Sequence, residues 1–335
     1  MRSSMSSCTV ILPALNEENV IEKAVAAIFS AFERVNLDIV IVDDGSTDGT
    51  WEKIKKISKD NPLVKGIRFT RNFGKEGAIM AGLHEAAGDC VIVMDSDLQF
   101  PPKTAVEMFE LWHTDGYMVV EGVKIRRQKE SFIYKLGASA FYKFLRRFAG
   151  LDMNNTSDFK LLDREVVELL KKMPERQSFF RAITGWTGVR SAKIYFTVQP
   201  RIGGATKWSY FRLMKFAVSS ITSFTTLPMQ LVTFTGFGFM LFALIMSVQT
   251  LWMKASGKAV AGFTTVIVLL LIVGSILMIS LGVIGVYIAK IYDEIKFRPR
   301  YIVSEISWDD GRKSKGIKPD KDFMDILAGR KSHRE

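Results

Sequence analysis

The feature of this sequence that most constrains its fold is an unbroken apolar segment that ends in two carboxylates. Residues 91–94 are all apolar, and Asp95 and Asp97 follow them closely. Such a run predicts a strand buried on both faces, as in a parallel sheet covered by helices. Residues two apart on an extended backbone point to the same side. Asp95 and Asp97 are therefore expected to lie together at the carboxyl edge of the sheet, where open α/β sheets bind their ligands.

Two carboxylates this close together favour a bound cation, because like charges repel unless a positive charge lies between them. Mg²⁺ or Mn²⁺ shared with substrate phosphates suits such a pair of oxygen ligands. An ordinary acidic turn after a core strand would explain an isolated Asp-x-Asp equally well, and a second acidic motif, described below, favours the metal. The three histidines have no ligand-like spacing, which argues against zinc.

The segments on either side of this strand alternate between strand and helix patterns. Strands are expected over residues 9–13, 38–42, 65–70 and 117–122, with helices between them. This alternation predicts a parallel doubly wound sheet. Right-handed crossovers would place the loops that follow its strands at one edge.

Three of those loops carry complementary chemistry. Asp43 and Asp44, after the second strand, can accept hydrogen bonds from a nucleobase or ribose. Arg71 and Lys75 can face phosphates, and Asp95 and Asp97 can hold the metal. The sequence has neither the lysine loop of P-loop proteins nor the glycine fingerprint of Rossmann proteins where these would be needed. A sheet that recognises a nucleotide with acids and a metal indicates a sugar nucleotide as the ligand.

The composition points to an anionic partner. The formal net charge is +11, which suits nucleic acid, a phosphorylated substrate or a membrane surface. The basic residues cluster around the apolar segments, so no nucleic-acid partner is expected. Cys8 and Cys90 adjoin predicted core strands and do not make a disulfide framework, which indicates a reducing compartment. The polar first residues run straight into a strand, so no signal peptide is expected.

Two long uncharged segments, residues 216–253 and 259–289, predict a transmembrane helical hairpin. Residues 229–253 are long enough to cross a hydrocarbon core of roughly 30 Å, and residues 259–289 can do so with some tilt. Lysines and arginines flanking the hairpin outnumber the two lysines of its loop, so the positive-inside rule puts the large domain and both termini in the cytoplasm. Glycines in both helices would permit close packing within one hairpin or between hairpins, and the second case would give a homo-oligomer.

A further segment, residues 132–148, has aromatic and aliphatic residues at helical spacing and a basic remaining face. This pattern is typical of a helix in the membrane interface, with a surface helix packed on the sheet as the alternative. The expected organisation is a nucleotide-binding core (1–125), an acceptor region with interfacial helices (126–228), two membrane spans (229–253 and 259–289) and a cytoplasmic tail (290–335).

Four motifs carry a resemblance to a known family. They are Pro13-x-x-Asn16-Glu17-Glu18, Asp43-Asp44-Gly45-Ser46-x-Asp48-Gly49-Thr50, Arg71-Asn72-x-Gly74-Lys75 and Asp95-x-Asp97-Leu98-Gln99. Their order and spacing resemble those of the GT-A-fold glycosyltransferases of family 2, and more narrowly the polyprenyl-phosphate glycosyltransferases, over about residues 9–292. The resemblance implies a nucleoside site at Pro13, Glu17, Asp43 and Asp44, with Lys75 also at the nucleotide. It implies a metal and pyrophosphate site at Asp95, Asp97 and Gln99.

The resemblance also implies that Asp158 lies near the acceptor, which makes Asp97 and Asp158 the candidate catalytic residues. A lipid monophosphate with a second pKa near 6 is already mostly ionised at neutral pH. Asp158 would therefore act either as a base or as a group that orients a sugar hydroxyl or the acceptor. A helix N-cap is the alternative without a role in catalysis.

The segment from Arg201 to Lys207 resembles the Arg-x-Gly-x-Ser-Lys segment of these enzymes, with Thr206 in place of serine. Arginine can grip a phosphate with two parallel hydrogen bonds, and lysine adds a point charge. Arg201 and Lys207 are therefore expected to bind the lipid phosphate or the departing diphosphate. Lys124 and Arg126 are expected to bind the lipid phosphate with them and to steer it. A solvated basic loop is the alternative.

The sequence thus predicts an integral membrane glycosyltransferase of the bacterial inner membrane or its equivalent. It would use Mg²⁺ or Mn²⁺ to move a sugar onto polyprenyl phosphate with inversion, in cell envelope glycosylation, with UDP-glucose as the favoured donor. GDP-mannose, UDP-N-acetylglucosamine and an aminoarabinose nucleotide are the alternative donors. A non-catalytic lipid-binding scaffold is the alternative from another class, although it would have no reason to keep two repelling acidic pairs.

Overall fold

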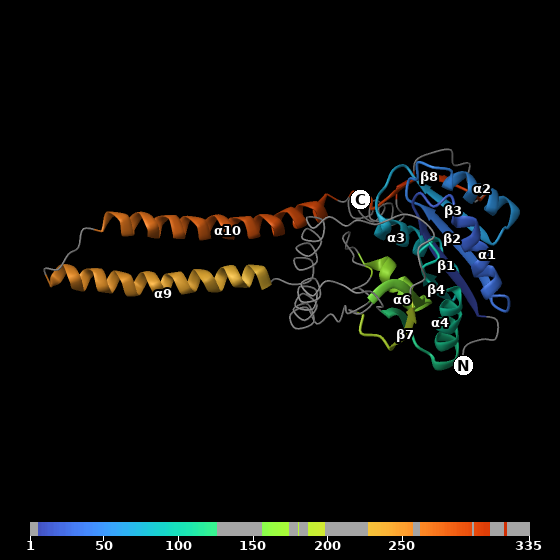
Figure 1. The fold of residues 1–335 in the computed structure, drawn as a ribbon, viewed down its shortest axis with the longest axis horizontal. Coiled ribbons are helices and arrows are strands. Elements are labelled where there is room, and N and C mark those ends of the chain that lie inside the picture. Colours follow the sequence, from blue (N-terminus) through green and yellow to red (C-terminus); the bar gives the residue numbers. More distant parts are fainter. Residues whose placement is uncertain are drawn as a thin grey trace, which may run out of the picture. The chain divides into compact units, whose positions relative to one another are not determined.

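The computed structural model describes residues 6–125, 156–173, 180, 187–197, 227–256, 262–296, 298–308 and 318–319. These residues belong to two compact units (Figure 1). The α/β unit comprises the described residues up to 197 and from 298 onward, and the helical unit comprises residues 227–256 and 262–296.

Four parallel strands form the centre of the α/β unit. They are β1 (Ser7–Ala14), β2 (Asn36–Asp43), β3 (Val64–Phe69) and β4 (Cys90–Val93). Their order in the sheet is β4-β1-β2-β3, and the register sets Ile11 opposite both Val40 and Val93. The carboxyl ends of these strands therefore meet at one edge, as predicted, and bring together the loops after β1, β2 and β4.

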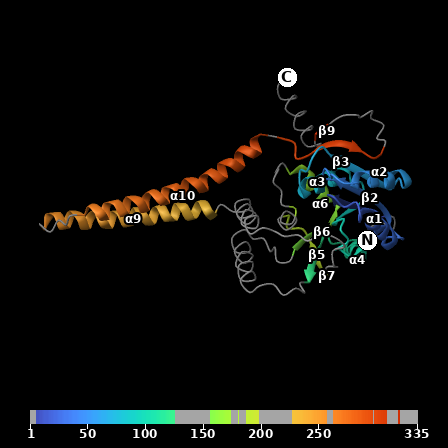
Figure 2. The same ribbon diagram turned by 45° about the horizontal axis from the view of Figure 1, so that its top comes forward.

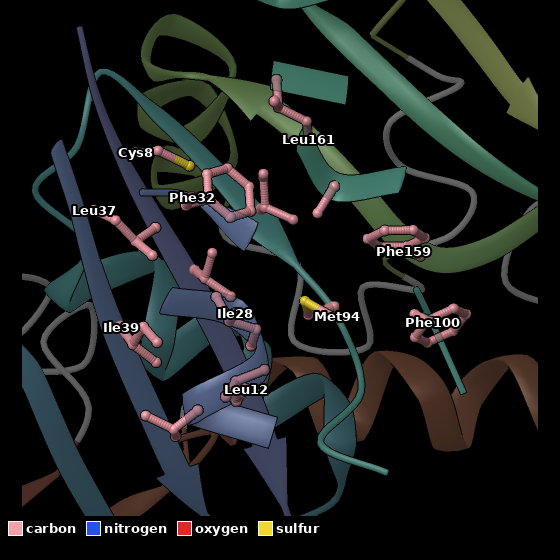
Figure 3. Packing of buried hydrophobic residues seen from close by; sticks show 14 of the residues in the cluster. Cys8, Leu12, Ile28, Phe32, Leu37, Ile39, Met94, Phe100, Phe159 and Leu161 are labelled. Carbon is pink, nitrogen blue, oxygen red and sulfur yellow. The ribbon is translucent and has the colours of Figure 1, made fainter. Parts of the chain in front are cut away.

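Helices cover both faces of this sheet. One face carries α1 (Ile21–Ala31), α2 (Thr50–Asp60) and α4 (Pro102–Asp115), and the other carries α3 (Lys75–Glu85) and α6 (Arg164–Lys172). Alternate strand residues point to opposite faces, so Leu12 lies in the first core and Ile11 in the second. Figure 3 shows the first core, in which Leu12 and Ile39 of the strands lie beside Ile28 of α1.

The sheet as a whole is mixed, so the prediction of a parallel doubly wound sheet is right only for its centre. β6 (Thr156–Asp163) runs antiparallel to β4 and to β5 (Val119–Ile125), and β7 (Ser191–Thr197) pairs in parallel with β5. β6 is not among the expected strands, although Asp158 and Lys160 alternate with Phe159 and Leu161 as in a strand with one polar face. Antiparallel pairing needs no crossover helix, which allows β6 to insert between β4 and β5.

The helical unit is a pair of long helices, α9 (Leu227–Ala255) and α10 (Phe263–Ile295), which lie side by side in both views (Figures 1 and 2). Large apolar side chains such as Phe234, Trp252 and Met278 are exposed along them. By length and composition, one segment of the described residues, Ile272–Ile295, suffices to cross a membrane, and Val232–Met246 in α9 is shorter. The two predicted helices are thus present, while a hairpin that crosses the membrane twice stays a prediction.

The segment after α10 forms a strand of the α/β unit. β8 (Ile302–Ile306) pairs antiparallel with β3 (Figure 1), and the short β9 (Lys318–Pro319) pairs antiparallel with β8 (Figure 2). The backbone N–H of Gly66 donates to Ser307 Oγ at 2.6 Å, and Tyr301 stacks on Phe69 with ring centroids 5.0 Å apart. Residues 302–306, predicted as part of a tail, therefore extend the sheet.

Tyr301→Ala tests how strongly this segment supports the α/β unit. Tyr301 is 4% exposed, and loss of a buried aromatic ring is expected to lower stability by about 3 kcal/mol and Tm by roughly 6–12 °C. Tyr301→Phe is the control, because it removes only the hydroxyl that lies 3.3 Å from His84 Nδ1, at a cost of about 1 kcal/mol. Tryptophan fluorescence of the full chain in detergent would report both transitions. Equal Tm values for the alanine variant and the wild type would contradict the prediction.

Candidate active site

A cavity of about 320 Å³ lies at the carboxyl edge of β1, β2 and β4. Its size is within the range of small-ligand sites in proteins. Its lining residues are Pro13, Ala14, Leu15, Glu17, Asp44, Asn72, Gly74, Lys75, Ala78, Asp95, Ser96 and Asp97. The structure thus brings together Pro13, Glu17, Asp44, Lys75, Asp95 and Asp97, which the sequence assigns to nucleoside, phosphate and metal.

Hydrogen bonds join the loop after β1 to the loop after β2, and the two loops form one wall of this cavity. The backbone N–H of Asn16 donates to Ser46 Oγ at 2.9 Å, and the N–H of Thr47 donates to Asn16 Oδ1 at 2.9 Å. The N–H of Gly49 donates to Glu18 Oε2 at 2.9 Å. The loop after β1 is therefore held in place by the loop after β2, which explains why both motifs are rich in short polar side chains.

The adjacent acids Asp43 and Asp44 have different surroundings. Asp44 lines the cavity, and its carboxylate accepts hydrogen bonds from the N–H groups of Phe73 (2.7 Å) and Gly74 (3.0 Å). Asp43 has a fully buried side chain whose Oδ1 accepts from Ser46 N–H at 2.9 Å. Asp44 thus fastens the loop before α3 at the cavity, whereas Asp43 supports the wall from behind.

Glycine at position 45 is required by this arrangement. Gly45 has φ +74°, and a Cβ there would lie 2.5 Å from the carbonyl carbon of Arg71. No side chain fits so close to another backbone segment. The Asp-Asp-Gly-Ser motif therefore combines two acids with a close approach of the loops after β2 and β3.

Asp43→Asn tests the electrostatic cost of this buried acid. Burial raises the pKa of Asp43, although hydrogen bonds from Ser46 and the charge of Arg68 act in the opposite direction. A carboxyl group whose pKa is raised on folding stabilises the fold below its unfolded value, near 3.8, and loses that contribution as the pH rises through the folded pKa. At a pH above the folded pKa, the charge of Asp43 thus opposes folding.

An asparagine at position 43 keeps an oxygen for the Ser46 N–H. The variant is therefore expected to have an unchanged or higher Tm than the wild type at pH 7, with the difference shrinking as the pH falls towards 4. Thermal unfolding between pH 4 and 8 measures this difference. A variant whose Tm is lower than that of the wild type at pH 7 would show that the charge of Asp43 stabilises the fold.

Lys75 connects two carboxylates from different parts of the chain. Its Nζ contacts Asp95 Oδ1 and lies 2.7 Å from Asp158 Oδ2. Burial lowers the pKa of Lys75, but the attraction of Asp95 and Asp158 outweighs it, and the net pKa is raised. The lysine is therefore protonated at neutral pH. The insertion of β6 beside β4 is what places Asp158, only 5% exposed, next to the predicted phosphate and metal residues.

Asp95 and Asp97 suit a divalent cation that substrate phosphates complete. Both line the cavity, and Asp97 Oδ1 accepts from Gln99 N–H at 3.1 Å across a turn in which Leu98 has φ +59°. Among the residues that the structure describes, no group of three or more His, Cys, Asp or Glu is placed to hold a metal alone. Mg²⁺ typically takes one or two carboxylates together with water and substrate phosphates, so the donor set fits.

The predicted basic residues of the acceptor side are only partly described. Lys124 Nζ lies 5.0 Å from the ring centroid of Phe100, which packs against Phe159 at 4.9 Å. Lys124 is thus held near the end of the metal motif. Arg126, Arg201 and Lys207, and the predicted interfacial helix at 132–148, lie outside the described residues.

Sequence reasoning misses a buried ion pair beside Asp158. Lys160 is fully buried, and its Nζ lies 2.6 Å from Glu121 Oε1 on the neighbouring strand. Lys160 lies two residues after Asp158 in β6, and Glu121 lies opposite Lys160 in β5. Both side chains therefore point to the face of the sheet that carries Asp158. Recognition of β6 as a strand would have placed Lys160 on the face of Asp158, but its partner Glu121 follows only from the register between β5 and β6.

Comparison with known proteins places the chain in a family. The family model described as Glycosyl transferase family 2 matches residues 9–170. The uncharacterized glycosyltransferase sll0501 of Synechocystis sp. is 36% identical over 302 residues, which cover 89% of this chain and 95% of the relative. The prophage bactoprenol glucosyl transferase homolog of Escherichia coli is 34% identical over 305 residues, 89% of this chain and 98% of the relative.

Another relative and one solved structure complete the comparison. The SfII prophage-derived bactoprenol glucosyl transferase of Shigella flexneri is 34% identical over 304 residues, covering 89% of this chain and 97% of the relative. Mannosyl-3-phosphoglycerate synthase from Rubrobacter xylanophilus matches 64% of this chain and 72% of its own, with 17% identity and a TM-score of 0.47. From its sequence relatives, the chain, with its GT-A-like mixed α/β sheet, belongs to glycosyltransferase family 2, in the polyprenyl-phosphate group that includes the bactoprenol glucosyl transferases.

Proposed function

We propose that this protein is a membrane enzyme that transfers a sugar from a nucleotide sugar, with UDP-glucose favoured, to polyprenyl phosphate. The observation that carries the proposal is the cavity at the sheet edge, where Asp95, Asp97 and Lys75 lie beside Glu17 and Asp44. Relatives that match nearly the whole chain are named bactoprenol glucosyl transferases, which supports the lipid acceptor and the glucosyl group.

The proposed reaction is a single displacement. A phosphate oxygen of the acceptor forms a bond to the anomeric carbon while the bond between that carbon and the diphosphate oxygen breaks. The electron pair leaves with the diphosphate, and the anomeric centre is inverted. The acceptor phosphate is already mostly ionised at neutral pH, so the step requires little proton removal.

Residues of this chain would orient the reactants and stabilise charge. Glu17 and Asp44 line the cavity where the nucleoside would lie. Lys75 is protonated and bonded to Asp158 at 2.7 Å, so its ammonium can donate to a phosphate oxygen while Asp158 orients the acceptor or a sugar hydroxyl. Mg²⁺ or Mn²⁺, held by Asp95 and Asp97, would supply positive charge to the departing diphosphate. Such positioning and electrostatic stabilisation are the main sources of catalysis proposed here.

The apolar surface of the helical unit supports a membrane location, as a lipid acceptor requires. Large apolar side chains are exposed along α9 and α10, and such surfaces are stable against lipid. We infer that both helices enter the membrane and that the α/β unit is cytoplasmic, because flanking lysines and arginines exceed those of the connecting loop. A membrane anchor would keep the enzyme where polyprenyl phosphate is found.

Transfer of radiolabelled sugar by the purified full chain in detergent tests the proposal. UDP-glucose, UDP-N-acetylglucosamine and GDP-mannose are offered in turn with polyprenyl phosphate and Mg²⁺, Mn²⁺ or EDTA. We expect organic-phase label from UDP-glucose with metal and none with EDTA, and a β-linked product by NMR. If only another donor gives label in the organic phase, that donor replaces UDP-glucose in the proposed reaction. Absence of lipid-linked label from every donor, despite nucleotide binding, would overturn the proposed reaction.

A further inference from the structure

We propose that Glu305, on the strand that follows the apolar helices, is a positioning residue for the donor nucleotide. It would hold Arg68 against the loop after β2 and so fix the wall of the donor cavity. This inference rests on the proposed function of that cavity. None of the motifs recognised in the sequence contains Glu305 or Arg68.

Asp43, Arg68 and Glu305 form a row across three neighbouring strands. The register pairs Asp43 of β2 with Arg68 of β3, and Arg68 with Glu305 of β8. Arg68 Nε lies 3.4 Å from Asp43 Oδ2, and Arg68 Nη1 lies 3.5 Å from Glu305 Oε1. Directly opposed residues on neighbouring strands point to the same side of the sheet, so the cation lies between two acids.

Trp51 fixes the outer acid of this row. Its Nε1–H donates to Glu305 Oε2 at 2.9 Å, and the Arg68 guanidinium lies 5.9 Å from the centroid of the same ring. Trp51 is fully buried at the start of α2. A rigid aromatic side chain thus contacts both Arg68 and Glu305 and limits the positions that either can take.

Arg68 also reaches the cavity wall directly. Its Nη2 donates to the carbonyl oxygen of Ser46 at 3.4 Å, and Ser46 Oγ accepts from the N–H of Asn16 at 2.9 Å. Asn16 precedes Glu17, which lines the cavity. The contacts therefore run from Glu305 through Arg68 and Ser46 to a residue beside the expected nucleoside position.

The exposed fractions of the three side chains in the row indicate that Glu305 affects the position of Arg68 more than the stability of the fold. The Glu305 side chain is 49% exposed and that of Arg68 is 27% exposed, whereas that of Asp43 is fully buried. An exposed ion pair contributes little to folding, so loss of the Glu305 charge should leave the fold intact. Arg68 would then be less constrained beside the Asp43 carboxylate and the Ser46 carbonyl. The greater freedom of Arg68 would change the position of the loop that forms the cavity wall.

The row also explains why the segment after α10 matters to the donor site. α10 ends at Ile295, and β8 begins at Ile302. The sheet centre is complete without β8, but the outer partner of Arg68 comes from it. β8 would thus contribute to donor binding as well as extend the sheet beyond β3.

Glu305→Gln in the full chain in detergent tests the inference, with UDP and Mn²⁺ as the binding probe in calorimetry. We expect the Kd for UDP and the KM for UDP-glucose to rise roughly five- to tenfold, a size typical of coupling between neighbouring side chains. The kcat and the Tm should change little. Glu52→Gln is the matched control, because it removes an exposed charge next to Trp51 but lies outside the row, and its Kd should equal that of the wild type.

The double variant Arg68→Gln/Glu305→Gln tests whether Glu305 acts through Arg68. If it does, Glu305→Gln has no further effect on the Kd when Arg68 is already replaced. An unchanged Kd in the single Glu305→Gln variant would overturn the inference, and so would effects that multiply independently in the double variant. If the wild type binds UDP and Glu305→Gln has the same Kd, the inference about Glu305 fails and the proposed function stands. If the wild type binds neither UDP nor GDP, the proposed function and the inference both fail.

Discussion

Asp97→Ala is expected to lower the rate of sugar transfer by at least about a thousandfold while UDP binding in EDTA is retained. Asp97 lines the cavity beside Asp95, and Gln99 N–H holds its Oδ1 at 3.1 Å. Without this carboxylate the proposed metal loses one of its two protein ligands, and the negative charge of the departing diphosphate is less stabilised. Radiolabel transfer measures the rate, and calorimetry with UDP measures binding separately.

Two further variants sharpen this prediction. Asp97→Asn keeps an oxygen for the Gln99 N–H but removes the charge, so it should be nearly as inactive as the alanine variant. Asp60→Ala removes an exposed carboxylate at the end of α2 and should transfer sugar at the wild-type rate. Transfer by Asp97→Ala at the wild-type rate would exclude Asp97 from catalysis.

Lys75→Met is expected to lower kcat by roughly a hundred- to a thousandfold. The lysine contacts Asp95 and lies 2.7 Å from Asp158, which is nearly buried. Its removal takes the positive charge from between two carboxylates, which then repel each other and the incoming phosphates. Methionine fills a similar volume, so the loss would reflect charge more than packing.

Lys75→Arg should retain a larger share of the rate, because the charge persists although the guanidinium has a different shape. Lys103→Met, at an exposed position of α4, is the control and should be fully active. Single-turnover transfer measures the chemical step without product release. A Lys75→Met variant with a wild-type single-turnover rate would contradict the role of Lys75 in catalysis and limit it to structure.

The sequence predicted the centre of the sheet well, because the evidence for it is local. Short runs of apolar residues such as 91–94, bounded by turn residues, are typical of strands covered on both faces, and they place Asp44, Asp95 and Asp97 at one edge. The cavity confirms that these side chains meet. What each of them binds stays a prediction that the experiments above address.

Strands that bring in distant residues were harder to predict. In β6, Asp158 and Lys160 alternate with apolar residues as in a strand with one polar face, but this local pattern does not show which strands β6 pairs with. Lys160 is acceptable there because Glu121 of β5 lies 2.6 Å away. The contact between Lys75 and Asp158 likewise depends on β6 lying beside β4.

The sequence by itself determined the family, the acidic loops and the two long apolar helices, because motif spacing and hydrophobic length are properties of adjacent residues. Only the tertiary structure decided that the segment after α10 completes the sheet and that Glu305 meets Arg68 beside Asp43. Those contacts join residues more than two hundred positions apart in the chain. Pairing at that distance depends on which strand edge the rest of the fold leaves open, and no local pattern specifies it.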